Sequence, residues 1–177
     1  PTGTGKTEVM IATVVSERRS KTCIVVPSNL LRKQTISRFC VLGKLREIGA
    51  INDQVYNPVI GCLVSSPKNI AELQDLLDQS NLIVTTMSLL NSTHFKEEFV
   101  NFLASECDTI IIDEAHHVPA SSWNYVKKIF GAVNCLQFTA TPFRNDGKKI
   151  AGDIIYNFPL ALAQEYGYFK PINFYPI

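Results

Sequence analysis

Short apolar runs alternate along this chain with longer stretches in which apolar residues recur every three or four positions. The runs are typical of strands buried in a parallel sheet, and the recurring pattern is typical of helices. The runs predict strands at 22–27, 59–64, 82–86, 110–112, 135–138 and 172–177. The recurring pattern predicts helices at 8–19, after Ser28, and at 70–77, 95–103, 119–130 and 160–166. Residues 43–58 fit neither pattern.

Because strand and helix signals alternate, we expect an α/β fold with a mostly parallel sheet. The 177 residues suit one globular domain. Hydrophobic residues make up 46% of the chain and charged residues 19%, and this composition excludes a disordered chain. The formal net charge is only +1. A nucleic-acid contact would therefore need a local set of donors rather than a broad basic surface.

The five cysteines are odd in number and form no Cys-x-x-Cys pair, which argues against a disulfide framework or a zinc site. Cys23, Cys62 and Cys135 lie in apolar runs, so we expect them in the core. Reduced cysteines indicate a cytoplasmic setting, or a nuclear one in a eukaryote. We expect no membrane partner, since no apolar run is long enough to cross a bilayer and no signal peptide is visible.

Two carboxylates follow directly on the most apolar strand. Ile110, Ile111 and Ile112 predict a central buried strand, and Asp113 and Glu114 stand at its carboxyl end. Unpaired carboxylates are costly in an apolar setting, and ligands of open α/β folds bind at this edge. The pair is expected to face a cation or a polarised water. A strand that ends in a solvated turn is the alternative.

The chain begins with Pro-Thr-Gly-Thr-Gly-Lys-Thr, directly before a predicted helix. Gly3 and Gly5 allow a tight turn whose N–H groups converge on a phosphate, and the helix dipole favours the same anion. Lys6 would reach the outer phosphates of a nucleoside triphosphate, and the Thr7 hydroxyl would hold Mg²⁺. A plain turn that caps a helix is the alternative.

Hydroxyl groups end other predicted strands. Thr85 and Thr86 are the last residues of one predicted strand, and Thr139 and Thr141 follow another. Phosphate contact and helix capping explain the first pair equally well. Ser28, between a strand and a helix, is a plausible helix cap and a candidate for a backbone-phosphate contact. Basic residues of the following helix (Arg32, Lys33 and Arg38) are more typical of a solvated face than of phosphate contacts.

The glycine-rich loop at the start of the chain and the two carboxylates after Ile112 are both expected at the carboxyl edge of one sheet. Lys6 and Thr7 with Asp113 suit a clamp on a magnesium–triphosphate complex. Glu114 could orient and deprotonate an attacking water.

Taken together, these stretches resemble the first RecA-like domain of superfamily 2 helicases and translocases. The nearest type is the DEAD/DEAH-box group that includes helicase segments of restriction enzymes and nucleotide-excision-repair helicases. The matching motifs are Pro-Thr-Gly-Thr-Gly-Lys-Thr (motif I), Val-Val-Pro-Ser-Asn-Leu-Leu (Ia), Val-Thr-Thr-Met-Ser-Leu-Leu (Ib), Asp-Glu-Ala-His-His (II) and Thr-Ala-Thr-Pro-Phe-Arg (III). Their order and their spread over nearly the whole chain make the signal specific.

The resemblance implies a three-layer RecA-like phosphate-loop fold over residues 1–177, without the strand upstream of the loop. It implies ATP and Mg²⁺ as cofactors, Glu114 as catalytic base and Asp113 with Thr7 on the metal. By the same resemblance, the nucleotide-binding residues are Gly3, Thr4, Gly5, Lys6 and Thr7; the coupling residues are His116, Thr139 and Thr141; and the nucleic-acid contacts are Pro27, Ser28 and Thr86. His117 and Arg144 match the restriction-enzyme subset without an assigned mechanism.

The family's adenine-reading segment and its second RecA-like domain, with the arginine fingers, are not in this sequence. We therefore expect the segment alone to be weakly active or inactive, and its partners to be a second RecA-like domain and nucleic acid, DNA rather than RNA. A small-molecule phosphate-loop kinase and a non-catalytic nucleic-acid-binding scaffold are the rival hypotheses. A kinase needs no Glu114 to activate water, and a scaffold needs none of the intact Lys6, Thr7 and Asp113.

Overall fold

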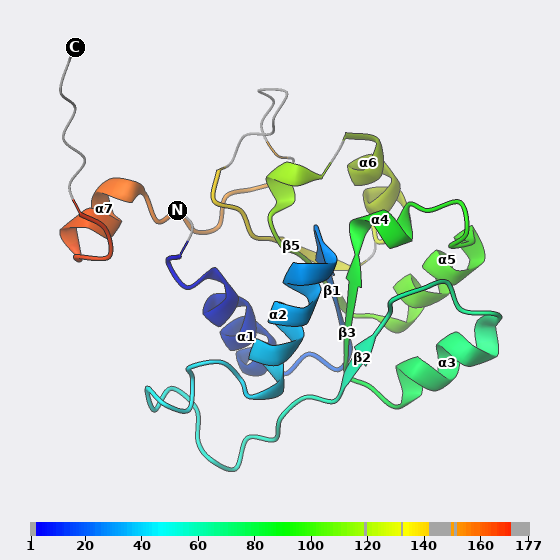
Figure 1. Ribbon diagram of the computed structural model, residues 1–177, viewed down its shortest axis with the longest axis horizontal. Helices are drawn as coiled ribbons and strands as arrows, with labels where there is room; N and C mark the ends of the chain where they lie inside the picture. Colours follow the sequence, from blue (N-terminus) through cyan, green and yellow to red (C-terminus); the bar gives the residue numbers. More distant parts are fainter. Residues whose placement is uncertain (1–2, 119, 132, 142–149, 151, 171–177) are drawn as a thin grey trace.

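The computed structural model describes residues 3–118, 120–131, 133–141, 150 and 152–170. Within them, strands and helices alternate as the apolar pattern predicts (Figure 1). The strands are β1 (Thr22–Val26), β2 (Ile60–Cys62), β3 (Leu82–Thr86), β4 (Thr109–Ile112) and β5 (Asn134–Gln137). The helices are α1 (Lys6–Ser16), α2 (Asn29–Cys40), α3 (Ile70–Asp78), α4 (Met87–Leu90), α5 (Glu97–Glu106), the 3₁₀ turn η1 (Ala115–His117), α6 (Ala120–Ile129) and α7 (Leu160–Glu165).

The strands form one sheet in the order β2-β3-β1-β4-β5, and each neighbouring pair is parallel. Parallel strands need crossover connections, and here helices supply them. Helices α1 and α2 cover one face of the sheet, and α3 and α5 cover the other (Figure 1). The predicted α/β class with a parallel sheet is confirmed.

Both faces of the central strands are buried, which is why they read as continuous apolar runs. Ile110, Ile112 and Val25 pack with α3, α5 and α6, whereas Ile111 and Ile24 pack with α1 and α2. Because every neighbouring pair is parallel, all five strands have their carboxyl ends at the same edge of the sheet. The loops that carry the candidate chemistry are fixed on this rigid frame.

Some element boundaries differ from the sequence prediction. Helix α1 ends at Ser16 rather than at 19, because Arg18 adopts a left-handed backbone with φ 50°. Strand β2 covers Ile60–Cys62 rather than 59–64. The predicted strand at 172–177 lies outside the described residues. No helix among the described residues combines the length and the apolar character needed to span a membrane.

The prediction that Cys62 and Cys135 are core residues is wrong, since both are exposed. They lie on β2 and β5, the two outer strands of the described sheet, where one side has no neighbouring strand. Cys23 is buried, as predicted, on the inner strand β1. Arg32 is also not part of a solvated face: it is buried, and its guanidinium donates to the Leu63 carbonyl at 3.4 Å.

Candidate functional site

The glycine turn before α1 has the shape of an anion-binding loop. Gly3 and Gly5 have φ of 78° and 86°, a conformation that favours glycine. Gly5 is the N-cap of α1, and no side chain of the described residues caps the helix there. The first N–H groups of α1 and its dipole are thus left to a negatively charged ligand.

Lys6 reaches across the sheet edge to the carboxylate that follows β4. Its Nζ lies 2.6 Å from Glu114 Oε1, and the two side chains are each 18% exposed. Glu114 has a left-handed backbone with φ 49°, and its N–H donates to Asp113 Oδ1 at 2.9 Å. Asp113 is held in turn by its own N–H, which donates to the Val25 carbonyl. The chain reversal after β4 therefore presents two carboxylates to the glycine loop.

This corner holds more negative charge than its own residues neutralise. Burial, and then the neighbouring Glu114, raise the pKa of Asp113. Glu114 Oε2 is buried and accepts no hydrogen bond from a described residue, although His116 Nδ1 lies 3.5 Å away. A carboxylate oxygen without a hydrogen-bond donor, beside a second buried carboxylate, fits a hard cation such as Mg²⁺, which prefers oxygen ligands. Thr7 and Asp113 line the same cavity and could both hold such an ion.

That cavity encloses about 690 Å³ and opens between the glycine loop, the end of β4 and α2. Its size is within the usual range for a small-molecule ligand, roughly 300–1,000 Å³. Glu8 in its wall pairs with Arg38 of α2 and accepts from the Lys44 N–H at 2.7 Å. Arg38 lines the cavity as well, but its side chain is still 43% exposed, as expected for a solvated helix face. Lys33 on the same helix is exposed.

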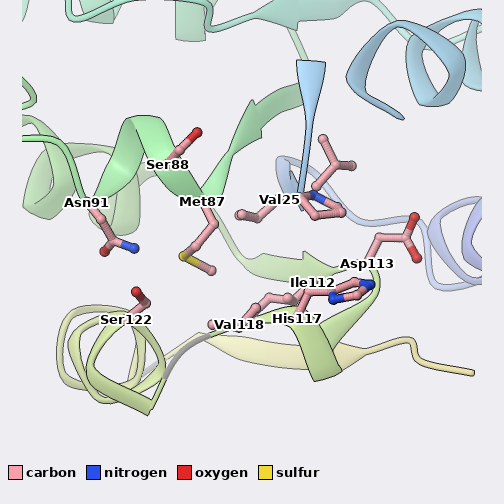
Figure 2. A pocket seen from close by; sticks show the side chains of 11 residues that line it. Val25, Met87, Ser88, Asn91, Ile112, Asp113, His117, Val118 and Ser122 are labelled. Carbon is pink, nitrogen blue, oxygen red and sulfur yellow. The ribbon is translucent and has the colours of Figure 1, made fainter. Parts of the chain in front are cut away.

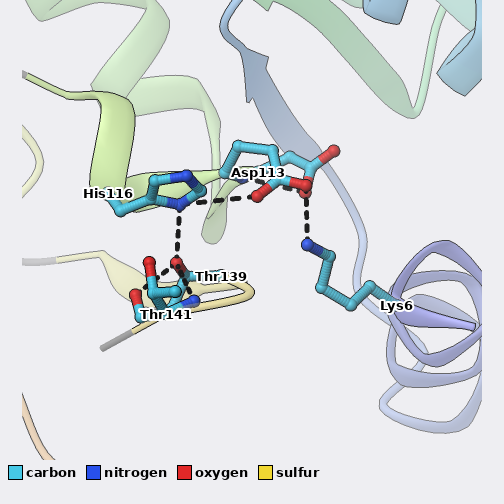
Figure 3. Close-up of polar contacts among 6 residues, drawn as sticks. Lys6, Asp113, His116, Thr139 and Thr141 are labelled. Carbon is cyan, nitrogen blue, oxygen red and sulfur yellow. Dashed lines mark hydrogen bonds and ion pairs between the residues drawn. The ribbon is translucent and has the colours of Figure 1, made fainter. Parts of the chain in front are cut away.

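A second polar group links the end of β4 to the end of β5. His116 Nδ1 lies 2.8 Å from Thr139 Oγ1, and the Thr139 hydroxyl donates to the Thr141 carbonyl at 2.7 Å (Figure 3). Since the one hydroxyl proton of Thr139 is used there, Nδ1 of His116 is the donor in the first bond. Burial, and then His117, lower the pKa of His116, so its neutral form is favoured.

The structure places the other predicted residues around this edge. Ser28 caps α2, accepting from the Leu31 N–H at 3.2 Å, and stays exposed. Thr86 is buried and caps α4, accepting from the Leu89 N–H at 3.3 Å. Thr4 lines a neighbouring cavity of about 440 Å³ together with Lys6 and Thr139. Arg144 lies outside the described residues.

Sequence reasoning missed a further cavity of about 290 Å³ at the same edge (Figure 2). Pro27 and Asp113 line it, but so do Asn91, the C-cap residue of α4, and Ser122 of α6. The last two belong to no recognised motif and come from separate parts of the chain. Only the folded sheet edge brings them together.

The fold and the site define a class, the RecA-like phosphate-loop domain. The family model described as "Type III restriction enzyme, res subunit" matches residues 1–144, so this chain belongs to that family. The membership of superfamily 2 helicases and translocases that the motifs predict is thereby confirmed.

Two characterised relatives agree with this placement. The chain is 30% identical over 146 residues to the transcription-repair-coupling factor of Rickettsia prowazekii, which covers 79% of this chain and 12% of the relative. It is 29% identical over 163 residues to the DNA 3'-5' translocase XPB2 of Sulfurisphaera tokodaii, which covers 88% of this chain and 30% of the relative. The chain thus spans less than a third of the length of either relative.

Proposed function

We propose that this chain is the ATP-binding motor domain of an ATP-dependent helicase or translocase that moves on DNA. The observation that carries the proposal is the contact between Lys6 and Glu114 in a cavity that Thr7 and Asp113 also line. The contact supports a site in which Lys6 would bind phosphate and Thr7 would bind the metal, beside the two carboxylates. The names of the relatives, one of them a DNA translocase, favour DNA over RNA as the track.

In this proposal the chain binds the triphosphate with the loop from Gly3 to Thr7. Backbone N–H groups of the loop and the start of α1 bind phosphate oxygens, and Lys6 binds the outer phosphates. Thr7 and Asp113 would hold Mg²⁺, and a bound Mg²⁺ would supply positive charge to the transferring phosphoryl group. Burial and the neighbouring Glu114 disfavour the charged form of Asp113, and a divalent cation would offset this cost.

Glu114 is the proposed base. While Lys6 is paired with it, Glu114 is poorly placed to accept a proton. A triphosphate draws Lys6 to its outer phosphates, and the freed Glu114 carboxylate then orients a water and accepts its proton. The nucleotide itself would thus switch the base from an ion-paired to a working state.

His116, Thr139 and Thr141 are the proposed coupling residues. They join the end of β4, where the carboxylates stand, to the end of β5. Nδ1 of His116 is 3.5 Å from Glu114 Oε2. Loss or gain of the γ-phosphate beside Glu114 would therefore change the electrostatic environment of His116. The bond to Thr139 would pass that change to the chain after β5.

The track would lie along the carboxyl edge, against Pro27, Ser28 and Thr86. Ser28 is exposed and could donate to a phosphate, whereas the buried Thr86 would act through the turn into α4 that it caps. We further infer that residues 1–177 are the first RecA-like domain and act with a second one. The five free cysteines suit a reducing compartment, the cytoplasm or a eukaryotic nucleus.

The test is ATP hydrolysis by the full-length protein with and without DNA, compared between wild type and Glu114→Gln. A motor hydrolyses ATP faster with DNA, and the variant binds ATP but does not turn it over. Transfer of phosphate to an added small-molecule hydroxyl would favour a kinase instead. An absence of magnesium-dependent ATP binding would favour a non-catalytic scaffold.

A further inference from the structure

The cavity that Figure 2 shows shares Asp113 with the proposed ATP site but includes no residue of the glycine loop. Its inner wall is apolar: Val25, Met87, Ile112 and Val118 are each less than a tenth exposed. At about 290 Å³ it lies at the small end of ligand cavities, which run from roughly 300 Å³ upward. One heterocycle fits this space better than a whole nucleotide.

The mouth of the cavity is polar. Ser88, Asn91 and His117 are exposed there, and Ser122 is half-buried. In Figure 2, Asn91 and Ser122 lie at the Met87 end, and Asp113 and His117 lie at the other end. Within the described part of the chain, neither the Asn91 amide nor the Ser122 hydroxyl hydrogen-bonds to another residue. The mouth therefore offers both donors and acceptors to a ligand whose body is apolar.

Charge narrows the choice of ligand. The described residues that line this cavity include the Asp113 carboxylate and neither lysine nor arginine. These lining residues offer no lysine or arginine to a phosphate group, and the Asp113 carboxylate itself would repel it. The cavity therefore suits an uncharged, flat ring with hydrogen-bonding edges.

We propose that this cavity takes one unstacked base of the nucleic-acid strand on which the motor moves. The apolar wall, with the Met87 thioether, suits the face of a base. The Asn91 amide, with one donor and one acceptor side, suits a base edge. Pro27 lines the cavity directly before Ser28, so a strand whose backbone follows Ser28 passes its mouth. This inference rests on the proposed motor function.

The proposal determines one property of the track. A base can enter the cavity only if it is unpaired and unstacked, so the strand at this point is single-stranded. Side-chain amides and hydroxyls can serve either a purine or a pyrimidine edge. The cavity therefore selects for the presence of a base and discriminates only weakly among sequences.

The experiment compares binding of two single-stranded oligonucleotides to the full-length protein. One carries all its bases, and the other has the same sugar-phosphate backbone but abasic positions throughout the binding site. Two variants on neighbouring positions of α6 give a matched pair. Ser122→Phe fills the cavity, and Ser121→Phe adds the same ring at an exposed position outside it. Asn91→Ala removes a mouth group without added bulk.

We expect the wild type and Ser121→Phe to bind the strand with bases about tenfold more tightly than the abasic strand. Ser122→Phe should lose most of this preference, Asn91→Ala should lose part of it, and both should bind the abasic strand as the wild type does. Equal binding of the two strands by wild type, or a preference that survives Ser122→Phe, overturns the base cavity. If neither strand binds and DNA leaves ATP hydrolysis unchanged, the motor function itself fails. If wild type binds the two strands equally and DNA still stimulates ATP hydrolysis, the base cavity is wrong but the motor function stands.

Discussion

Lys6 Nζ and Glu114 Oε1 are 2.6 Å apart, although the two residues are 108 positions apart in the chain. The proposed phosphate-binding cation and the proposed base thus neutralise one another when no nucleotide is bound. In the proposed mechanism, ATP would have to separate them before Glu114 could act. The ion pair would keep the proposed base inactive until a triphosphate binds.

Glu114→Gln should therefore affect binding and turnover in opposite directions. ATP no longer has to break a partly exposed ion pair, so binding should tighten by about two- to fivefold. Turnover should fall by about 10²–10⁴-fold because the base is lost. Nucleotide titration and steady-state hydrolysis measure the two effects. Glu98→Gln is the matched control, since Glu98 is exposed and pairs with Lys96 at 3.3 Å. Weaker ATP binding by Glu114→Gln would contradict the account.

Asp113→Asn should stabilise the fold while it removes magnesium-dependent ATP binding. Burial raises the pKa of Asp113, so the folded protein loses stability as the pH rises through that pKa. Asparagine does not titrate and avoids this loss. We expect a gain of about 1 kcal/mol near pH 7, or about 2–4 °C in Tm. The gain should shrink as the pH falls toward 3.8, the ordinary value for an aspartate. A lower Tm for the variant near pH 7 would show that Asp113 is structural.

His116 should give the fold a pH dependence of the opposite sign. Burial, and then His117, lower its pKa, so the unfolded chain binds the proton more readily. The wild type should therefore lose stability as the pH falls below the ordinary histidine value of 6.5, and His116→Gln should lose less. Thermal melts at about pH 7.5 and about pH 5.5 give the difference. His94→Gln, at an exposed position, should keep the wild-type difference. Equal losses in wild type and His116→Gln would refute the assignment.

Thr139→Val should uncouple hydrolysis from DNA. Valine keeps the shape but removes the oxygen that accepts from His116 and donates to the Thr141 carbonyl. Basal hydrolysis should stay within about threefold, because the Thr139 hydroxyl hydrogen-bonds to His116 and Thr141 and not to Lys6 or Glu114. Stimulation by DNA should fall by about tenfold or more. Thr139→Ser keeps the hydroxyl and should retain the stimulation. Full stimulation in Thr139→Val would exclude the coupling role.

Thiol labelling should separate the cysteines by depth. Cys40 and Cys62 are exposed and should react promptly with a thiol reagent at about pH 8. Burial raises the pKa of Cys107 to about 12 and also raises the pKa of Cys23, so both should react only after unfolding. Mass spectrometry of the labelled peptides measures the order. Prompt labelling of Cys23 would contradict the buried position of β1.

The strands and the meeting of the two carboxylates with Lys6 were predictable for a physical reason. A run such as Ile110–Ile112 has no polar position to expose, so it must be buried on both faces. Buried parallel strands bring their carboxyl ends to one edge, and this edge collects Lys6, Asp113 and Glu114.

Contacts that depend on the sheet order could not be predicted. Cys62 and Cys135 lie in apolar runs, yet they are exposed because β2 and β5 are the outer strands of the described sheet. Arg38 is partly exposed, as its helix pattern suggests, but its ion pair with Glu8 depends on the packing of α2 against α1. Asn91 and Ser122 carry no motif, and only the packing of α4 and α6 at the sheet edge makes them neighbours of one cavity.

Pulsed electron paramagnetic resonance of the full-length protein, with Mn²⁺ in place of Mg²⁺ and with ATP, tests whether the two stretches share one metal–triphosphate site. We expect phosphorus coupling to the bound manganese. It also predicts that this signal is lost in Thr7→Val and in Asp113→Asn but kept in Thr13→Val, a matched change one turn or more along α1. A bound Mn²⁺–ATP complex that is unaffected by both Thr7→Val and Asp113→Asn would show that the two distant stretches do not share one metal–triphosphate site.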